Sequence, residues 1–201
     1  MNNRLGRIGS LIAAITVLLF AACMLLDFSF GSYLVCIFLS FGFVLMISAF
    51  KEECAPDRRA LAGAAMAFAA VYCALILLVY FAQITSVRLD GLNAQAMRIM
   101  DYTSFGLFFN YDLLGYGLMA LSTFFVGWTI EANNRTDRWL KWLLILHGVF
   151  FPPCLLMPML GIFSTQPENG YRAGVIALEC WCAYFLPVSV LAYRHFRHNG
   201  R

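Results

Sequence analysis

Six long apolar stretches dominate this sequence of 201 residues and limit what it can fold into. A helix that crosses a bilayer needs roughly 20 predominantly apolar residues, because its backbone polar groups must be satisfied internally. The stretches that qualify are about 8–26, 30–50, 61–87, 104–130, 139–163 and 173–193. The sequence therefore predicts an all-α fold, a bundle of six transmembrane helices that forms one domain over residues 1–201.

The composition agrees with this fold class and argues against others. Hydrophobic residues make up 62% of the chain and charged residues only 12%, whereas soluble domains contain about 45–50% apolar residues. The net charge of +3 comes from scattered Lys and Arg, so nucleic acid is not an expected partner. The seven cysteines contain no C-x-x-C pair, so no metal site, disulfide framework or cofactor is indicated.

Lys and Arg in the connections predict the orientation, because cytoplasmic loops carry an excess of these residues. With a cytoplasmic N-terminus, eleven basic residues lie inside, and Arg88, Arg98 and Arg172 lie outside. We therefore expect a multi-pass protein of the cytoplasmic membrane with both termini in the cytoplasm. The longest outer connection, 88–103, has an apolar spacing that predicts a short surface helix.

The N-terminal region allows a second interpretation. Arg4 and Arg7 precede an apolar run that reaches Cys23, and this pattern resembles a lipoprotein signal peptide with its lipidated cysteine. Cleavage there would leave five spans. The apolar run continues through residues 24–26 to the length of a full span, which favours a retained first helix.

Four polar side chains fall inside the predicted spans at a similar depth, in the outer half of the membrane. Asp112 lies about 12 Å into the fourth span and Glu179 about 9 Å into the sixth, with Asn110 and Gln83 near the same level. A carboxylate in hydrocarbon must be neutralised, paired or hydrated. No Lys or Arg lies inside a predicted span at that depth, so these four residues are the candidate ligand-binding residues.

Prolines in the fifth predicted span mark the same region. Pro152, Pro153 and Pro158 each remove a backbone N–H donor and bend or break a helix. Irregular backbone at membrane depth is tolerated beside protein or water, which would fit a cavity next to Pro152 and Pro153. The structural alternative is that the two carboxylates fold back to arginines of the outer loops or to backbone donors.

Two other features have mainly structural interpretations. His147 lies about 12 Å from the cytoplasmic end of the fifth span. We expect it to bond a neighbouring helix, with a proton relay as the alternative. In the third span, Gly63, Ala67 and Ala70, and also Ala65 with Ala69, recur at helical spacing, and such small residues let backbones approach closely. This face is expected to pack against a neighbouring span or a partner helix.

The stretches YDLLGYGLMALSTFFVGW (111–128) and RWLKWLLILHGVF (138–150) resemble small bacterial six-span membrane proteins of unknown function. This resemblance is one of layout and implies no site residue. The six-span format is also similar to the substrate-binding subunits of energy-coupling-factor vitamin transporters, which take ligand from the outer side. That family implies an Ala-x-x-x-Ala ridge in the first span, and Ala13, Ala14, Ala21 and Ala22 have no alanine four residues later.

These observations predict a solute-binding or transport-related membrane protein with a polar pocket in the outer half of the membrane. The expected ligand is a small cationic or donor-rich solute. One alternative is a regulatory or assembly subunit whose acids pair internally, and another is an intramembrane enzyme with Asp112 and Glu179 as acid and base. No G-x-S-x-G, H-E-x-x-H or Walker motif is present, so no catalytic residue is assigned.

Overall fold

The computed structural model describes residues 1–163 and 167–198 of the chain, with side chains given outside 164–173. The described residues are almost entirely helical and include no strand, which confirms the all-α prediction. The α-helices are α1 (Asn2–Leu25), α2 (Ser29–Glu53), α3 (Arg59–Ala82), α4 (Ala94–Met100), α5 (Leu107–Thr129), α6 (Arg135–His147), α7 (Phe151–Met159) and α8 (Pro167–His198). The short turns between them are η1 (Pro56–Arg58), η2 (Gln83–Val87), η3 (Tyr102–Ser104) and η4 (Gly148–Phe150).

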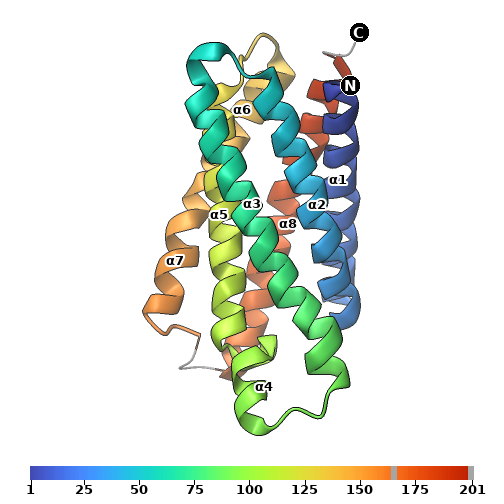
Figure 1. Cartoon of the computed structure of the whole chain (residues 1–201), viewed down its shortest axis with the longest axis vertical. Helices are drawn as coiled ribbons and strands as arrows, with labels where there is room; N and C mark the ends of the chain where they lie inside the picture. Colours follow the sequence, from blue (N-terminus) through green and yellow to red (C-terminus); the bar gives the residue numbers. More distant parts are fainter. Residues whose placement is uncertain (164–166, 199–201) are drawn as a thin grey trace.

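The long helices form an up-and-down bundle in which α1 begins and α8 ends at the same end (Figure 1). Helix α1 packs against α2 and α8, and α3 packs against α2 and α5. Helix α5 in turn contacts α6 and α7. The short helix α4, in the long connection between α3 and α5, confirms the helix predicted there from apolar spacing.

Five helical segments of the described chain are long and apolar enough to cross a membrane, which indicates a membrane protein. These segments are Asn2–Leu25, Ser29–Glu53, Pro56–Val87, Arg135–Met159 and Gly174–His198. Six spans were predicted, and the helix missing from this set is α5. Its 23 residues include Asn110, Asp112 and several glycines, which reduce its apolar character.

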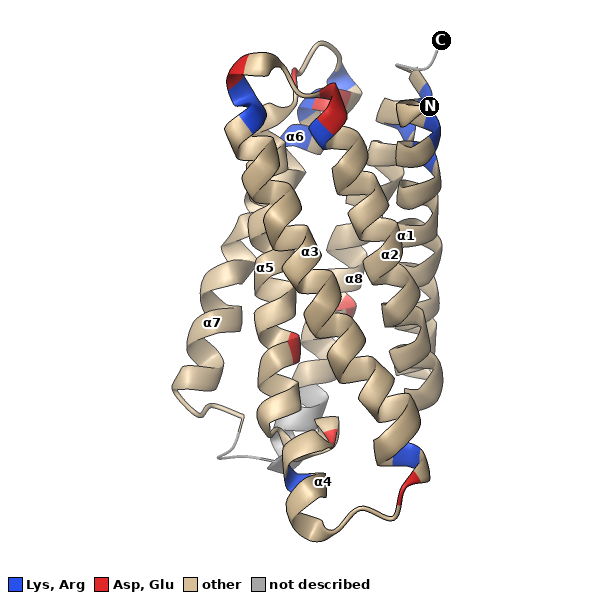
Figure 2. Cartoon of the chain, viewed as in Figure 1, with Lys and Arg blue, Asp and Glu red and all other residues tan. Residues whose placement is uncertain are grey.

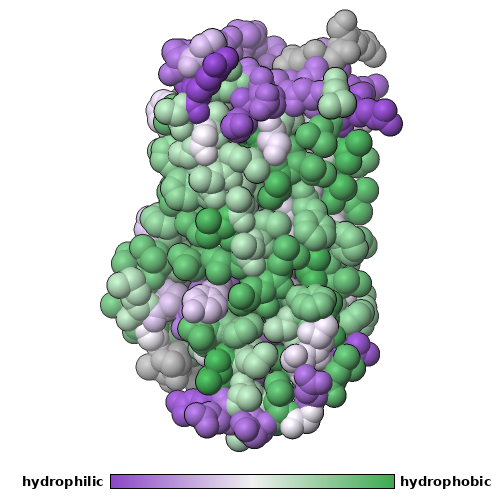
Figure 3. All heavy atoms as spheres, viewed as in Figure 1, coloured by the Kyte–Doolittle hydropathy of each residue, from purple (hydrophilic) through white to green (hydrophobic). Residues whose placement is uncertain are grey.

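Charged and apolar residues are segregated along the bundle axis. Most Lys and Arg of the described chain gather where α1 begins and α8 ends, and few lie at the opposite end (Figure 2). A broad apolar band separates these two hydrophilic ends (Figure 3). This distribution is that of a protein whose middle faces hydrocarbon and whose ends face water.

Small residues determine how closely the helices pack. A Cβ atom at Gly9 of α1 would lie 2.6 Å from the backbone nitrogen of Met46 in α2, so this contact requires glycine. On α3, Ala65 and Ala69 are fully buried, and the carbonyl of Ala65 accepts a hydrogen bond from Ser122 of α5 at 2.8 Å. α3 therefore packs within the chain through its Ala65 and Ala69 side.

The other small-residue face of α3 is open. No described atom lies within 4 Å of a Cβ built at Gly63, and Ala67 and Ala70 are exposed. Packing of this face on another span of the chain is therefore not seen among the described residues. A partner helix on the Gly63 face stays a prediction.

The fifth predicted span is irregular next to its prolines, although Arg135–Met159 stays one continuous helical segment. α6 ends at His147, the turn η4 follows, and α7 begins at Phe151. Pro152 and Pro153 lie in the first turn of α7, where a helix has unpaired N–H positions and tolerates proline. Neither proline lines the cavities described below, so the cavity predicted beside them has no support.

Candidate functional site

Asp112 is almost completely buried in the bundle. Its Oδ2 accepts a hydrogen bond from the Tyr102 hydroxyl at 3.3 Å, and the hydroxyl of Tyr80 also faces the carboxyl group. Its Oδ1 has no hydrogen-bond partner among the described residues. No salt bridge of the described chain involves Asp112. Within the part of the chain that the structure describes, the carboxyl group of Asp112 is therefore contacted only by neutral groups.

Gln83 holds Tyr102 in position. It lies in η2, a π-helical turn that ends α3, and such turns are frequent at functional sites. The Nε2 of Gln83 donates to the carbonyl of Met100 at 2.6 Å, and its Oε1 accepts from the backbone N–H of Tyr102 at 3.1 Å. The structure thus links two of the four predicted residues, Gln83 and Asp112, through Tyr102.

A small cavity lies next to these tyrosines, near the turn between α1 and α2. Its volume of about 70 Å³ is enough for a few water molecules. Tyr33, Tyr80 and Tyr102 line it together with the polar side chains of Asp27 and Ser32. Because Tyr80 and Tyr102 also face the carboxyl group of Asp112, their side chains lie between the cavity and that group.

The other two predicted residues do not contact Asp112. Asn110 is half-buried and makes no side-chain hydrogen bond within the described chain. It lies two residues from Asp112, and helix positions two apart point to different faces. Glu179 is half-buried near Cys182, and its Oε1 has no hydrogen-bond partner among the described side chains. Among the described residues, no hydrogen bond joins the carboxyl groups of Asp112 and Glu179.

Neither Arg88 nor Arg98, two of the three arginines that were predicted to lie on the outer side, neutralises Asp112. The guanidinium of Arg88 lies over the ring of Phe30, 4.8 Å from its centroid. Arg98 forms no salt bridge within the part of the chain that the structure describes. The side chain of Arg172 lies outside the described residues.

His147 is fully enclosed at the end of α6, and both of its ring nitrogens are bonded. The indole nitrogen of Trp181 donates to Nε2 at 3.0 Å, and Nδ1 lies 2.7 Å from Oγ1 of Thr123. Since an indole can only donate, Nε2 is the acceptor, and the proton of the neutral ring resides on Nδ1. His147 thus joins α5, α6 and α8 with neither nitrogen left for a relay, which favours its structural interpretation.

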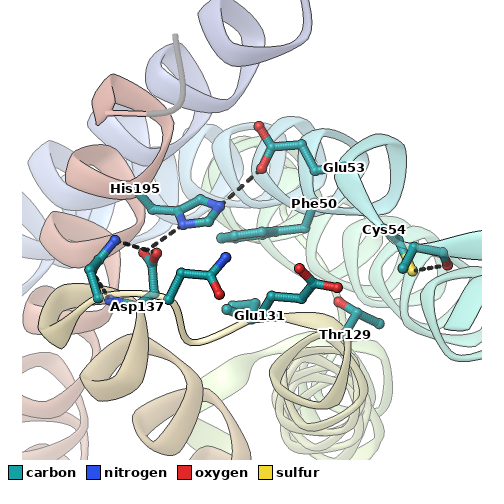
Figure 4. Close-up of a pocket in the computed structure, with 11 residues that line it drawn as sticks. Phe50, Glu53, Cys54, Thr129, Glu131, Asp137 and His195 are labelled. Carbon is teal, nitrogen blue, oxygen red and sulfur yellow. Dashed lines mark hydrogen bonds and ion pairs between the residues drawn. The ribbon is translucent and has the colours of Figure 1, made fainter. Parts of the chain in front are cut away.

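A larger pocket of about 530 Å³ opens at the end of the bundle where α8 ends, and we call it the His195 vestibule (Figure 4). It lies between the ends of α2, α5 and α8 and the start of α6. Its polar wall is formed by Glu53, Glu131, Asn134, Asp137 and His195. Pockets with a few converging polar groups are the usual place for a ligand site.

His195 lies between two carboxylates in this vestibule (Figure 4). Its Nδ1 lies 2.7 Å from Oδ1 of Asp137 and its Nε2 lies 2.9 Å from Oε2 of Glu53. Ionised carboxylates only accept hydrogen bonds, so two such partners favour an imidazolium ring that donates from both nitrogens. Asn134 donates to the second oxygen of Asp137 at 2.6 Å. The cluster is therefore internally paired and joins α2, α6 and α8.

Glu53, Asp137 and His195 were not among the residues predicted from the sequence, which placed the two acids in or beside connections. Two signals in the sequence point to them. Asn134 and Asp137 have the spacing of a capping box, and the side chain of Asn134 accepts from the backbone N–H of Asp137 at 2.8 Å. His195 lies in the last turn of α8, on the same predicted side of the membrane as both acids.

Neither site has the form of a metal centre. No group of three or more His, Cys, Asp or Glu in the described chain is arranged to hold a metal ion. Comparisons of this chain with protein-family models, with curated proteins and with solved structures find no match.

Proposed function

We propose that this chain is a solute-binding or transport-related membrane protein that takes up a small cation, or the cationic end of a small solute, at Asp112. One observation carries the proposal. The carboxyl group of Asp112 is buried, and one of its oxygens has no partner among the described residues. A buried carboxylate without a cation is costly, so a proton or a cation from outside the chain completes this site.

The arrangement of polar groups along α5 supports uptake from the side of α4. Thr123, which contacts His147, lies eleven residues beyond Asp112, about 16 Å along the helix. Thr129, in the wall of the His195 vestibule, lies about 9 Å further. A ligand from the vestibule would have to pass the closed contacts of His147. A ligand from the small cavity needs only Tyr80 or Tyr102 to move.

The proposal includes six spans, with α5 as the sixth, and both termini in the cytoplasm. An even number of crossings is supported by the start of α1 and the end of α8, which lie at the same end of the bundle (Figure 1). The excess of Lys and Arg at that end supports its cytoplasmic location (Figure 2). The 23 residues of α5 are enough to cross about 30 Å of hydrocarbon.

Cysteine labelling tests this topology. Gly91 and Asn133 lie in connections at opposite ends of the bundle, and both are exposed. In a variant whose native cysteines are replaced, Gly91→Cys should react with a membrane-impermeant maleimide on intact cells. Asn133→Cys should react only after permeabilisation. The reverse pattern would contradict the orientation, and with it the entry of ligand from the outer side.

Ligand-dependent stabilisation tests the site itself. The purified full-length chain is screened by thermal unfolding against alkali cations, amines and donor-rich solutes, with Asp112→Asn and Glu179→Gln in parallel. A ligand at 100 times its Kd should stabilise the wild type by about 2.7 kcal/mol. Asp112→Asn should lose this effect and Glu179→Gln should retain it. A ligand that stabilises Asp112→Asn as well as the wild type would contradict the proposal.

A further inference from the structure

A groove on the outside of the bundle combines two basic side chains with an apolar wall. It has a volume of about 580 Å³ and lies where η1 and α3 meet the end of α5 and the start of α6. Its lining residues are Arg58, Leu61, Phe124, Phe125, Trp128 and Lys141. None of these residues lines the His195 vestibule or the small cavity near Asp112.

Backbone carbonyls at the end of α5 hold both basic side chains in the groove. Nη1 of Arg58 donates to the carbonyl of Thr129 at 3.5 Å, and Nζ of Lys141 donates to the carbonyl of Ile130 at 3.3 Å. A helix C-terminus carries partial negative charge, which favours cations there. Each contact uses one donor, whereas a guanidinium has five and an ammonium three. Most donors therefore remain for an anionic group.

Neighbouring acidic side chains do not cancel this positive charge. Asp57 lies 3.6 Å from Nε of Arg58, but its side chain is 74% exposed, and exposed ion pairs are weak. Within the described residues, no salt bridge involves Lys141. The groove therefore presents a net positive charge to a ligand.

The apolar wall runs from the basic residues toward the middle of the bundle. Phe124 lies one turn before Trp128 on α5, about 6 Å deeper along the helix, and their rings pack edge to face. Trp139 and Trp142, which flank Lys141 in the sequence, are both exposed, as tryptophans at a membrane interface are. The basic residues thus lie at headgroup level and Phe124 at the level of the acyl chains.

We propose that this groove binds one anionic phospholipid. The lipid phosphate contacts Arg58 and Lys141, and an acyl chain lies along Leu61 and Phe124. The paired positive charge favours an anionic over a zwitterionic headgroup. The apolar wall favours a lipid over free phosphate, because it buries hydrocarbon that phosphate lacks. This site is independent of the one proposed at Asp112.

Native mass spectrometry of the purified full-length chain tests the lipid site. Phosphatidylglycerol and phosphatidylcholine with identical acyl chains are offered to the wild type and to Arg58→Gln/Lys141→Gln. The wild type should retain phosphatidylglycerol preferentially. The double variant should lose about 30-fold of that preference, because each basic residue near a headgroup contributes about fivefold. Arg194→Gln/Arg197→Gln is the matched control, since it removes the same charge from α8 at the same end of the bundle.

Three outcomes would overturn the proposal. The first is a wild type without headgroup preference, and the second is an equal loss of preference in the groove variant and the control. The third is displacement of the lipid by equimolar inorganic phosphate, which would make the groove a free-phosphate site. Helical circular dichroism confirms folding of each variant. Lys141→Met keeps the aliphatic stem and serves as a second variant, with an expected loss of about fivefold.

Discussion

Asp112 and Asp137 are almost equally buried, with exposures of 1% and 4%, but their surroundings differ. Asp137 accepts hydrogen bonds on both oxygens, from His195 and from Asn134. Asp112 accepts one bond from Tyr102, and its other oxygen has no partner in the described chain. Burial alone therefore does not distinguish the two acids. Their partners do, because a buried carboxylate without an internal cation needs a proton or a cation from outside the chain.

The largest effect that would test this comparison is expected at Asp137. Asp137→Asn leaves the His195 cation with Glu53 alone, and breaking a buried ion pair costs about 3–5 kcal/mol. Asp112→Asn removes a carboxyl group that has no cationic partner among the described residues, so the free energy of unfolding should change by less than about 1 kcal/mol. Unfolding in mixed micelles of increasing SDS content measures both values. Similar losses in the two variants would show that both acids are structural.

His195→Gln should have the next largest effect. The substitution leaves the carboxylates of Glu53 and Asp137 without their cation, and we expect a loss of about 3 kcal/mol, at the lower end of the range for a broken buried ion pair because Glu53 stays partly hydrated. His198→Gln, an exposed position in the same last turn of α8, is the matched control and should change stability by less than about 0.5 kcal/mol. The SDS unfolding titration measures the free energy of unfolding of both variants. Equal effects of the two substitutions would contradict the internally paired cluster.

Much of the fold was predictable because it follows from local patterns. Apolar runs located most of the helices, the prolines at 152, 153 and 158 predicted an irregular fifth span, and apolar spacing predicted a short helix within 88–103, where α4 lies. Whether α5 crosses the membrane was less predictable, because Asp112 weakens its apolar character. A membrane-spanning helix can contain such a residue when its polar face is buried against protein.

The partners of the polar residues were not predictable from local patterns. Tyr102 reaches Asp112 because the chain turns back at Phe105, which has a left-handed conformation with φ of 50°. His195 and Glu53 are 142 residues apart in the sequence. The opposite protonation of His147 and His195 depends on Trp181 in one case and on two carboxylates in the other. Such pairings are set by tertiary packing.

Tyr102→Phe tests how much the Tyr102 hydroxyl contributes to the surroundings of Asp112. It removes the hydroxyl that donates to Oδ2 and keeps the ring that packs on Phe109. We expect a loss of about 1 kcal/mol, because a single hydrogen bond at 3.3 Å contributes about that much to stability. The carboxyl group should also become easier to reach from the small cavity, so a ligand of Asp112 should associate faster. Stopped-flow binding measures this rate, and a slower association would argue against Tyr102 as a barrier.

Asn110→Ala is expected to have the smallest effect, and it tests whether the site extends beyond Asp112 and Gln83. The side chain of Asn110 is half-buried and makes no hydrogen bond within the described residues, so the free energy of unfolding should change by less than about 0.5 kcal/mol. Ligand affinity should also stay within about twofold of the wild type, because Asn110 points to a different face of α5 from Asp112. Isothermal titration of both proteins with the same ligand measures this ratio. A loss of tenfold or more would place Asn110 in the site after all, and would mean that α5 rotates when the ligand binds.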